Sequence, residues 1–256
     1  MPDVGWAAQS AAVAHVLHAG PLDDDLVVSG ADGHHLERVR RLRAGELVTV
    51  GDGTGQWREY DIESANRGTL TLCARSAPRV EPRLTPAVSV AFALTKGGKP
   101  DSVAAQLTEL GVDRLLPVVA ARSVVRWKRA DRDPGERLAR VVREAAMQCR
   151  RARLPVIEPV VPLADLAGRA GLVVADREGE SAPALPEPGP EGWLLLIGPE
   201  GGLEPQEVQD LGPCHRLGLG PHILRAETAA GAALGALSFR RHPEEDHGGW
   251  ARGPTF

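Results

Sequence analysis

Two glycine-containing junctions in the C-terminal half of the chain carry the residues best suited to bind a ligand. The first, LLLIGPEGGLEPQEV at 194–208, is an apolar run that ends in Gly-Pro-Glu-Gly-Gly before a polar, helix-prone segment. Glycines let a backbone approach a ligand closely and present several N–H groups to it. The spacing is not that of a phosphate-binding loop, and Glu200 would repel a phosphate, so a neutral or cationic ligand fits better. Taken alone, a plain turn explains this stretch equally well.

The second junction is LGLGPHILRAETAAGAALGALSF at 217–239, where another apolar strand end leads through a turn into a helix. Arg225 and Glu227 stand at the start of that helix. An arginine at a helix N-terminus opposes the helix dipole, so a role other than helix stability is indicated for it. Gly231 and Gly235 share one helix face, which would let a partner subunit pack closely; an ordinary buried small-residue helix is the alternative.

The elements that position these junctions alternate between strand and helix. Apolar runs at 88–94, 172–176 and 193–198 read as buried strands, and helices are expected over 101–111, from Asp133 onward and in the Ala-rich segment after Glu227. Such alternation predicts an α/β fold with a parallel sheet. Ligands of open α/β sheets bind outside the carboxyl ends of the strands, where both junctions lie.

The N-terminal third of the chain has a different, β-rich character. The cluster GDGTG at 51–55 separates two strand-like runs and predicts a hairpin, and one short basic helix is expected around 36–42. A segment with three prolines follows and reads as a linker. The expected organisation is therefore a β-rich domain (1–76), a linker (77–86), an α/β domain (87–241) and a disordered polar tail (242–256).

Charge and composition narrow the class of partner. The net charge is −4, yet residues 34–43 hold four arginines against one glutamate, and residues 122–153 hold eleven basic side chains against four acidic ones. Solvated helix faces would explain either run, but two basic runs in an acidic protein favour an anionic partner. The three isolated cysteines show no metal-binding spacing and fit a reducing cytoplasm. No apolar run is long enough to span a membrane.

Together the two junctions closely resemble the ribosomal RNA small subunit methyltransferase E family, which belongs to the SPOUT class of knotted methyltransferases. LLIGPEGGLEPQEV and LGLGPHILRAETAAGAAL carry most of the resemblance. Three further stretches agree and occur in the right order: HHLERVRRLRAG, LTKGGKPDSVAAQLTELGVDRLLPV and EAAMQCRRARLPVIEP. The match covers nearly the whole chain.

The resemblance implies an N-terminal PUA-like β-barrel domain that docks RNA and a C-terminal SPOUT domain with a parallel sheet and a trefoil knot. It implies a cytoplasmic homodimer, joined through the SPOUT domains. The implied reaction transfers the methyl group of S-adenosylmethionine to N3 of a uridine in 16S ribosomal RNA of the small subunit, without a metal. The positions implied to bind the cofactor are Ile197, Gly198, Glu200, Gly201, Gly202, Leu217, Leu219, Gly220, Ile223 and Leu224.

The resemblance also assigns roles to charged residues. Methylation of uridine N3 requires loss of its proton, and Arg225 is expected to stabilise the resulting negative charge. The proton would pass to Glu227, to water or to another group. Two pairs of arginines are expected to position phosphates without reading sequence, Arg38 with Arg41 and Arg151 with Arg153. Two positions depart from the family pattern: Met147 stands where many relatives carry an acidic residue, and His222 where an arginine is frequent.

Two other interpretations compete with this one. Another SPOUT enzyme could act on transfer RNA or on a ribose 2′-hydroxyl, but its domains and tail motifs would usually be arranged differently. A non-catalytic RNA-binding module could retain the fold, but Arg225, Glu227 and the first glycine junction are all present.

Overall fold

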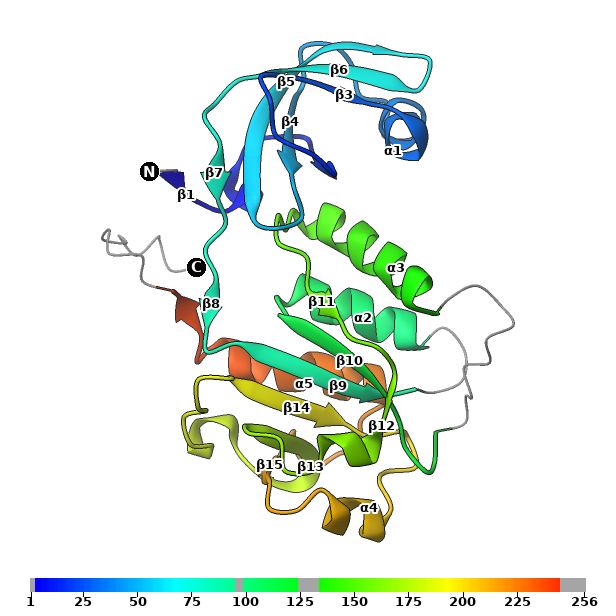
Figure 1. The fold of residues 1–256 in the computed structure, drawn as a ribbon, viewed down its shortest axis with the longest axis vertical. Coiled ribbons are helices and arrows are strands. Elements are labelled where there is room, and N and C mark those ends of the chain that lie inside the picture. Colours follow the sequence, from blue (N-terminus) through cyan, green and yellow to red (C-terminus); the bar gives the residue numbers. More distant parts are fainter. Residues whose placement is uncertain (1–2, 95–98, 124–133, 245–256) are drawn as a thin grey trace.

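The computed structural model describes residues 3–94, 99–123 and 134–244, and these form two seven-stranded sheets (Figure 1). Each sheet has its own hydrophobic core. One core is built from residues between Ala14 and Leu72, and the other sheet is covered on both faces by residues between Val88 and Leu237. No helix in the described ranges combines the length and apolar character needed to cross a membrane.

The N-terminal sheet is mixed and runs in the order β1-β7-β5-β4-β2, with β6 joining β5 to β3. Only the pairs β1–β7 and β2–β4 are parallel. The hairpin predicted at GDGTG is confirmed, because β4 and β5 pair antiparallel on either side of it, with Gly51 opposite Trp57. The strands are β1 (Asp3–Val4), β2 (Ala14–Leu17), β3 (Asp25–Val28), β4 (Leu47–Gly51), β5 (Gln56–Asn66), β6 (Thr69–Ala74) and β7 (Arg79–Val80).

The short basic helix differs from its prediction. Helix α1 (Gly30–His34) begins earlier and continues into a turn of π-helix, η2 (His35–Val39). Leu36 and Leu42, which bound the predicted helix, are both buried in the N-terminal core. The segment nevertheless leaves the helix before Leu42, since Arg41 adopts a φ of 58°.

The C-terminal sheet runs in the order β11-β10-β9-β14-β13-β15, with β12 also on β10, and every pairing in it is parallel. The predicted parallel α/β fold is therefore confirmed; the trefoil knot stays a prediction. The strands are β9 (Val88–Ala93), β10 (Arg114–Val119), β11 (Val156–Ile157), β12 (Val161–Pro162), β13 (Leu172–Glu180), β14 (Trp193–Ile197) and β15 (His215–Leu217).

Helical elements cover both faces of this sheet. Successive side chains of a strand point to opposite faces, so a continuous apolar run must be buried on both. Val90 and Phe92 of β9 pack with α2, α3 and α5, whereas Ala91 and Ala93 face the opposite layer that contains η3. Helix α3 also packs beside β2 and so lies between the two sheets (Figure 1). The helical elements are η1 (Ala7–Gln9), α2 (Lys99–Glu109), α3 (Pro134–Cys149), η3 (Leu163–Leu166), η4 (Ala182–Ala184), α4 (Pro205–Asp210) and α5 (Ala226–Ser238).

The proline-rich linker is more ordered than its sequence suggests. It contributes β7 to the N-terminal sheet and β8 (Leu84–Thr85), which pairs antiparallel with β16 (His242–Pro243). The expectation that the tail is disordered from residue 242 is therefore wrong for β16. Arg241 fixes this pairing, because its buried guanidinium donates to the carbonyls of Pro86 and Gly111 and pairs with Asp113. Residues 245–256 lie outside the described residues.

Candidate functional site

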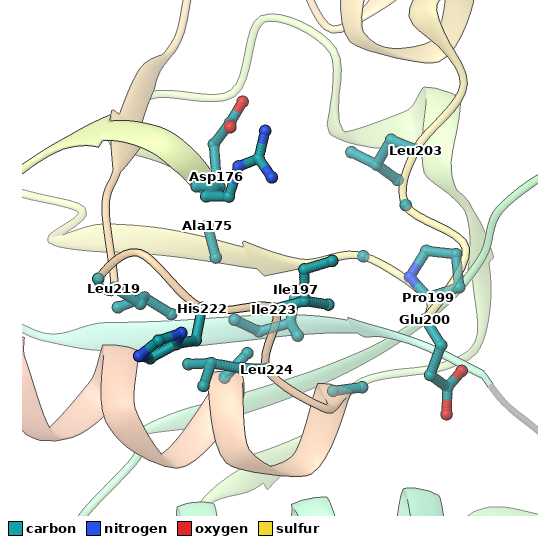
Figure 2. A pocket seen from close by; sticks show the side chains of 16 residues that line it. Ala175, Asp176, Ile197, Pro199, Glu200, Leu203, Leu219, His222, Ile223 and Leu224 are labelled. Carbon is teal, nitrogen blue, oxygen red and sulfur yellow. The ribbon is translucent and has the colours of Figure 1, made fainter.

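The two glycine junctions meet at a single cavity of about 230 Å³ at the carboxyl end of β14, beside the middle of β13. The loop after β14 forms one wall, and the loop from Leu219 to Leu224 that leads into α5 forms another. Figure 2 shows Ile197, Ile223 and Leu224 gathered at the end of β14, with Leu219 and His222 beside them. The position agrees with the general rule for ligand sites in parallel sheets.

Eight of the ten positions expected to bind a cofactor line this cavity: Ile197, Gly198, Glu200, Gly202, Leu219, Gly220, Ile223 and Leu224. The other two do not. Leu217 is fully buried in the core beneath the loop. The free face of Gly201 lies against Arg122, since a Cβ built on this glycine would stand 3.3 Å from Arg122 Cδ.

Sequence reasoning missed another eight lining residues. The middle of β13 supplies three of them, directly after the residues of β13 that pair with β14. That neighbourhood follows from the strand order, which the sequence alone did not give. The missed residues are Ala175, Asp176, Arg177, Pro199, Leu203, His222, Ala226 and Ala229.

Tight turns shape the loops of the cavity. The N–H of Gly202 donates to the Pro199 carbonyl at 2.8 Å, which closes a turn over Glu200 and Gly201. Gly202 and Gly220 have φ values of 71° and 107°, a region that side chains with a Cβ rarely adopt. A Cβ at either position would meet no atom within 4 Å. These two glycines are therefore required by backbone conformation and not by crowding.

Apolar walls and a charged rim give the cavity its chemical character. Ile197, Leu219 and Leu224 provide apolar surface, and Ile223 is 86% exposed at the mouth. Asp176 lines the rim; its Oδ2 accepts from Arg216 Nη1 at 3.0 Å and its Oδ1 accepts from the Glu178 N–H at 3.0 Å. The combination suits a ligand with an aromatic or aliphatic body and cationic or hydroxyl groups.

Arg225 and Glu227 stand beside the cavity without lining it. Arg225 is the exposed N-cap residue of α5, between the lining residues Leu224 and Ala226. Glu227 is half-buried, and its Oε2 is buried without a hydrogen-bond partner among the described residues. An unpaired buried carboxylate oxygen costs stability, which favours a functional reason for keeping it there.

Arg38 and Arg41 are exposed at the end of the α1–η2 segment. The Arg38 guanidinium is 63% exposed and pairs with Glu37 at 3.3 Å. Arg41 holds a left-handed backbone conformation, and such strain concentrates at functional sites. Their exposure is compatible with the expected contact to an anionic partner.

Arg151 and Arg153 both direct their guanidinium groups at backbone carbonyls. Arg151 donates to the carbonyls of Thr108 and Val112 at 3.0 and 2.6 Å. Arg153 donates to the carbonyls of Thr54 and Glu81. Arg151 therefore binds carbonyls within the C-terminal domain, whereas Arg153 binds carbonyls of the N-terminal hairpin and the linker. The phosphate-positioning role of this pair stays a prediction.

These two arginines belong to a clasp between the sheets, which we define as Glu81, Arg143, Arg150, Arg151 and Arg153. Glu81 is only 4% exposed and its carboxylate accepts from the Ala152 N–H at 2.5 Å. From α3, Arg143 donates to the Leu17 carbonyl and pairs with Asp32 at 2.6 Å. Arg150 donates to the Ser10 carbonyl at 3.0 Å. In the N-terminal domain the clasp thus reaches Ser10, Leu17, Asp32 and Thr54, and in the linker it includes Glu81.

A buried histidine lies at the same junction. His15 Nδ1 is 2.9 Å from Thr49 Oγ1, while Nε2 has no partner among the described residues. Burial, with smaller contributions from the charges of Arg150 and Arg143, lowers the pKa of His15 to about 4. Burial also raises the pKa of Glu81. In the ranges the structure covers, no three His, Cys, Asp or Glu side chains are grouped as metal ligands.

Comparison with known proteins places the chain among RNA methyltransferases. A family profile described as an RNA methyltransferase domain matches residues 82–238, and an RNA methyltransferase PUA domain profile matches residues 28–72. Among curated relatives named ribosomal RNA small subunit methyltransferase E, that of Mycobacterium bovis is 38% identical over 223 residues, covering 82% of this chain and 85% of the relative. That of Bacillus subtilis is 32% identical over 229 residues, covering 83% and 89%.

Solved structures agree with this placement. A methyltransferase from Legionella pneumophila, determined in complex with the bound cofactor SAM, superposes with a TM-score of 0.79 at 25% identity and covers 88% of this chain and 97% of its own. The ribosomal RNA small subunit methyltransferase E of Neisseria gonorrhoeae shares the fold, with a TM-score of 0.78 at 23% identity over 89% and 97%.

Proposed function

This chain belongs to the ribosomal RNA small subunit methyltransferase E family, and we propose that it transfers a methyl group from S-adenosylmethionine to N3 of a uridine in 16S ribosomal RNA. The observation that carries the proposal is that residues of both glycine junctions line one cavity, with Arg225 and Glu227 at its side. That the chain is an RNA methyltransferase follows from the family; the base, the atom and the site residues are our proposal.

The cavity fits S-adenosylmethionine. Its apolar walls suit the adenine ring, and the glycines Gly198, Gly202 and Gly220 in its lining let a ligand approach the backbone closely. The carboxylates of Asp176 and Glu200 at the rim suit the positive charges of this cofactor and would disfavour a phosphate. When bound, S-adenosylmethionine supplies a methyl group on a sulfonium, an electrophile that needs no metal to activate it.

The residues beside the cavity suit the demands of uridine methylation. N3 must lose a weakly acidic proton, and the resulting negative charge spreads onto the two neighbouring oxygens. Arg225 is exposed and stands between the lining residues Leu224 and Ala226, and we assign it the stabilisation of that charge. Glu227 is our candidate for the proton acceptor, since its Oε2 has no hydrogen-bond partner among the described residues.

Exposed side chains on the two domains support proposals for RNA docking and for assembly into a dimer. Arg38 and Arg41 would contact phosphates and orient the RNA without reading its sequence. We also propose that the C-terminal domains form a homodimer. In support, Phe239 at the end of α5 is 95% exposed, and a Cβ on Gly235 of the same helix would meet no atom within 4 Å. An exposed apolar side chain beside a small-residue face suits a second copy of the chain.

The test is transfer of labelled methyl from S-adenosylmethionine to small ribosomal subunits from cells that lack the endogenous modification. The modified nucleotide is then mapped and its methyl position is determined by mass spectrometry. Label on N3 of one 16S uridine supports the proposal. Label on transfer RNA or on a ribose hydroxyl would overturn the substrate, whereas cofactor binding without any transfer would make the chain a binding module.

A further inference from the structure

A side chain outside the cavity grips the loop that forms its wall. Arg122 lies in the segment after β10, and its Nη1 donates to the Gly201 carbonyl at 2.5 Å. Its Nε is 3.7 Å from the Glu204 carboxylate. Arg122 does not line the cavity. We propose that Arg122 is a positioning residue that holds the loop from Gly198 to Gly202 in its ligand-binding shape before the cofactor arrives; this rests on the proposed cofactor site.

The contact fixes one particular peptide group. The bond between Gly201 and Gly202 presents its carbonyl to Arg122, and its N–H donates to the Pro199 carbonyl at 2.8 Å. Both polar ends of the peptide are therefore held from opposite directions. Its rotation would break one contact or the other. The turn that presents Glu200 and Gly202 to the cavity thus depends on Arg122 from the outside.

Such a grip matters because the loop is rich in glycine. Gly198, Gly201 and Gly202 have more backbone freedom than other residues. A ligand that has to order them binds more weakly, because the lost conformational entropy opposes binding. A loop that is ordered in advance removes this cost from binding. An external arginine can supply the order while the lining residues stay free for the ligand.

A second contact holds the same region. The Ala121 N–H donates to Glu207 Oε1 at 2.7 Å, and Glu207 Oε2 accepts from the Glu204 N–H at 2.8 Å as half of the capping box of α4. Glu207 therefore joins the segment after β10 to the start of α4. The Ala120 N–H also donates to Ser123 Oγ at 2.9 Å, which stiffens the segment that carries Arg122.

The exposure of the pair separates positioning from stability. The side chains of Arg122 and Glu204 are 47% and 45% exposed, and exposed ion pairs contribute little to folding. Loss of Arg122 should therefore leave the fold intact. Its effect should be confined to the order of the loop and to the affinity of the ligand that the loop holds.

The experiment compares Arg122→Ala, Arg122→Lys and the control Arg114→Ala by calorimetric titration with S-adenosylmethionine. Arg114 is the matched control because it lies on β10 and its exposed guanidinium pairs with Glu158 at 2.6 Å, away from the loop. Arg122→Ala should raise the cofactor Kd by about tenfold, because the ligand must then order the glycine-rich loop as it binds. Arg122→Lys should recover part of the affinity, and Arg114→Ala should match wild type.

A double-mutant cycle identifies the route of the effect. Gly201→Ala places a methyl 3.3 Å from Arg122 Cδ and should disturb the same grip, so its effect and that of Arg122→Ala should combine less than additively. Amide exchange of residues 198–204 in the ligand-free Arg122→Ala variant should be faster than in wild type. With saturating cofactor, kcat and the KM for RNA should stay within about twofold of wild type, because the grip acts on cofactor affinity.

The outcomes separate this inference from the proposed function. Wild type that binds neither S-adenosylmethionine nor its demethylated product would overturn the cofactor site. Normal wild-type binding with an unchanged Kd in Arg122→Ala would overturn the positioning role alone. If Arg122→Ala lowered both the melting temperature and the amide protection of the whole chain, the positioning role would also be overturned. Arg122 would then stabilise the whole fold.

Discussion

At the residue scale, Arg225 concentrates the chemical proposal, because it is an exposed cation at a helix N-terminus that borders the cavity. A cation there is unfavourable for α5, whose first turn also carries Glu227. In the proposed reaction, Arg225 stabilises negative charge on the uridine in the transition state, which gives a reason for a cation at this position. Arg225 should therefore matter for turnover more than for cofactor affinity.

Arg225→Ala should lower kcat by about 100-fold, the loss expected when a group that stabilises developing charge is removed. The Kd of S-adenosylmethionine should stay within about twofold, since the Arg225 side chain does not line the cavity. Single-turnover kinetics and calorimetry measure the two quantities, and Arg225→Lys serves as the charge-conserving comparison. A normal rate in Arg225→Ala would remove this residue from the mechanism.

Gly220 tests whether loop conformation governs cofactor binding. Its φ of 107° would strain any side chain, although the space around it is open. Gly220→Ala should weaken cofactor binding by about tenfold, because conformational strain of this kind costs about 1–3 kcal/mol. Gly189→Ala is the control, since a Cβ there also meets nothing within 4 Å and no left-handed φ is required. Equal affinities in both variants would contradict the requirement for glycine.

At the scale of elements, the sequence predicted what local pattern determines. Apolar runs such as 88–94 became β9, and the stripe through Leu138 and Val142 became the buried face of α3. The GDGTG hairpin formed because its glycines allow the turn. Patterns of this kind need no knowledge of distant residues.

Elements that depend on distant partners were not predictable in this way. The π-helical turn η2 is stabilised from outside, where Glu37 accepts from the Gly68 N–H at 2.7 Å. The pairing of β16 with β8 joins residues more than 150 positions apart. The environment of a basic residue also depends on distant partners. Spacing alone does not distinguish exposed Arg38 from Arg151, which donates to two interior carbonyls. The cavity residues in the middle of β13 were missed because their position depends on the strand order, which also involves distant partners.

The contact between β2 and the end of α3 gives the fold a pH dependence. The neutral ring of His15 is buried there, with a pKa of about 4 in the folded chain against 6.5 for an ordinary histidine. Between pH 6.5 and 4 the unfolded chain gains a proton that folded His15 does not, so stability is lost as pH falls through this window. The raised pKa of Glu81 acts in the opposite direction, because its contribution is greater at acid pH and is lost as pH rises.

The histidine contribution can be isolated by a variant. Urea unfolding of wild type and His15→Gln between pH 7 and pH 4 should show a wild-type free energy of unfolding that declines more steeply. Between pH 7 and pH 4, the free energy of unfolding of wild type should fall by up to about 3 kcal/mol more than that of His15→Gln. Parallel profiles for the two proteins would mean that His15 titrates normally in the folded state.

At the scale of the whole molecule, the proposed function requires two surfaces to act on one RNA. Arg38 and Arg41 lie on the N-terminal domain, whereas the cavity lies in the C-terminal sheet. Their separation is set by the clasp, in which Arg143 of α3 reaches Leu17 and Asp32. A nucleotide presented to the cavity is therefore positioned by an interdomain contact that touches neither RNA nor cofactor.

Arg143→Leu and Arg38→Gln should both weaken RNA binding, but for different reasons. Arg38→Gln removes a phosphate contact, so the slope of log affinity against log salt concentration should fall by about 1. Arg143→Leu loosens the domains and should leave that slope nearly unchanged while it lowers kcat/KM for RNA by about tenfold, because misplacement of a bound substrate costs rate. Cofactor affinity should be normal in both variants.

The control for both is Arg75→Gln, which removes an exposed arginine of the N-terminal domain that pairs with Asp61 at 2.9 Å outside the clasp. Small-angle scattering should show a broader distribution of domain separations for Arg143→Leu alone. A changed salt slope in Arg143→Leu, with an unchanged scattering profile, would instead make Arg143 a direct phosphate ligand. The basic end of α3 would then belong to the RNA surface, and the fixed distance between docking surface and cavity would have to come from the linker strands β7 and β8.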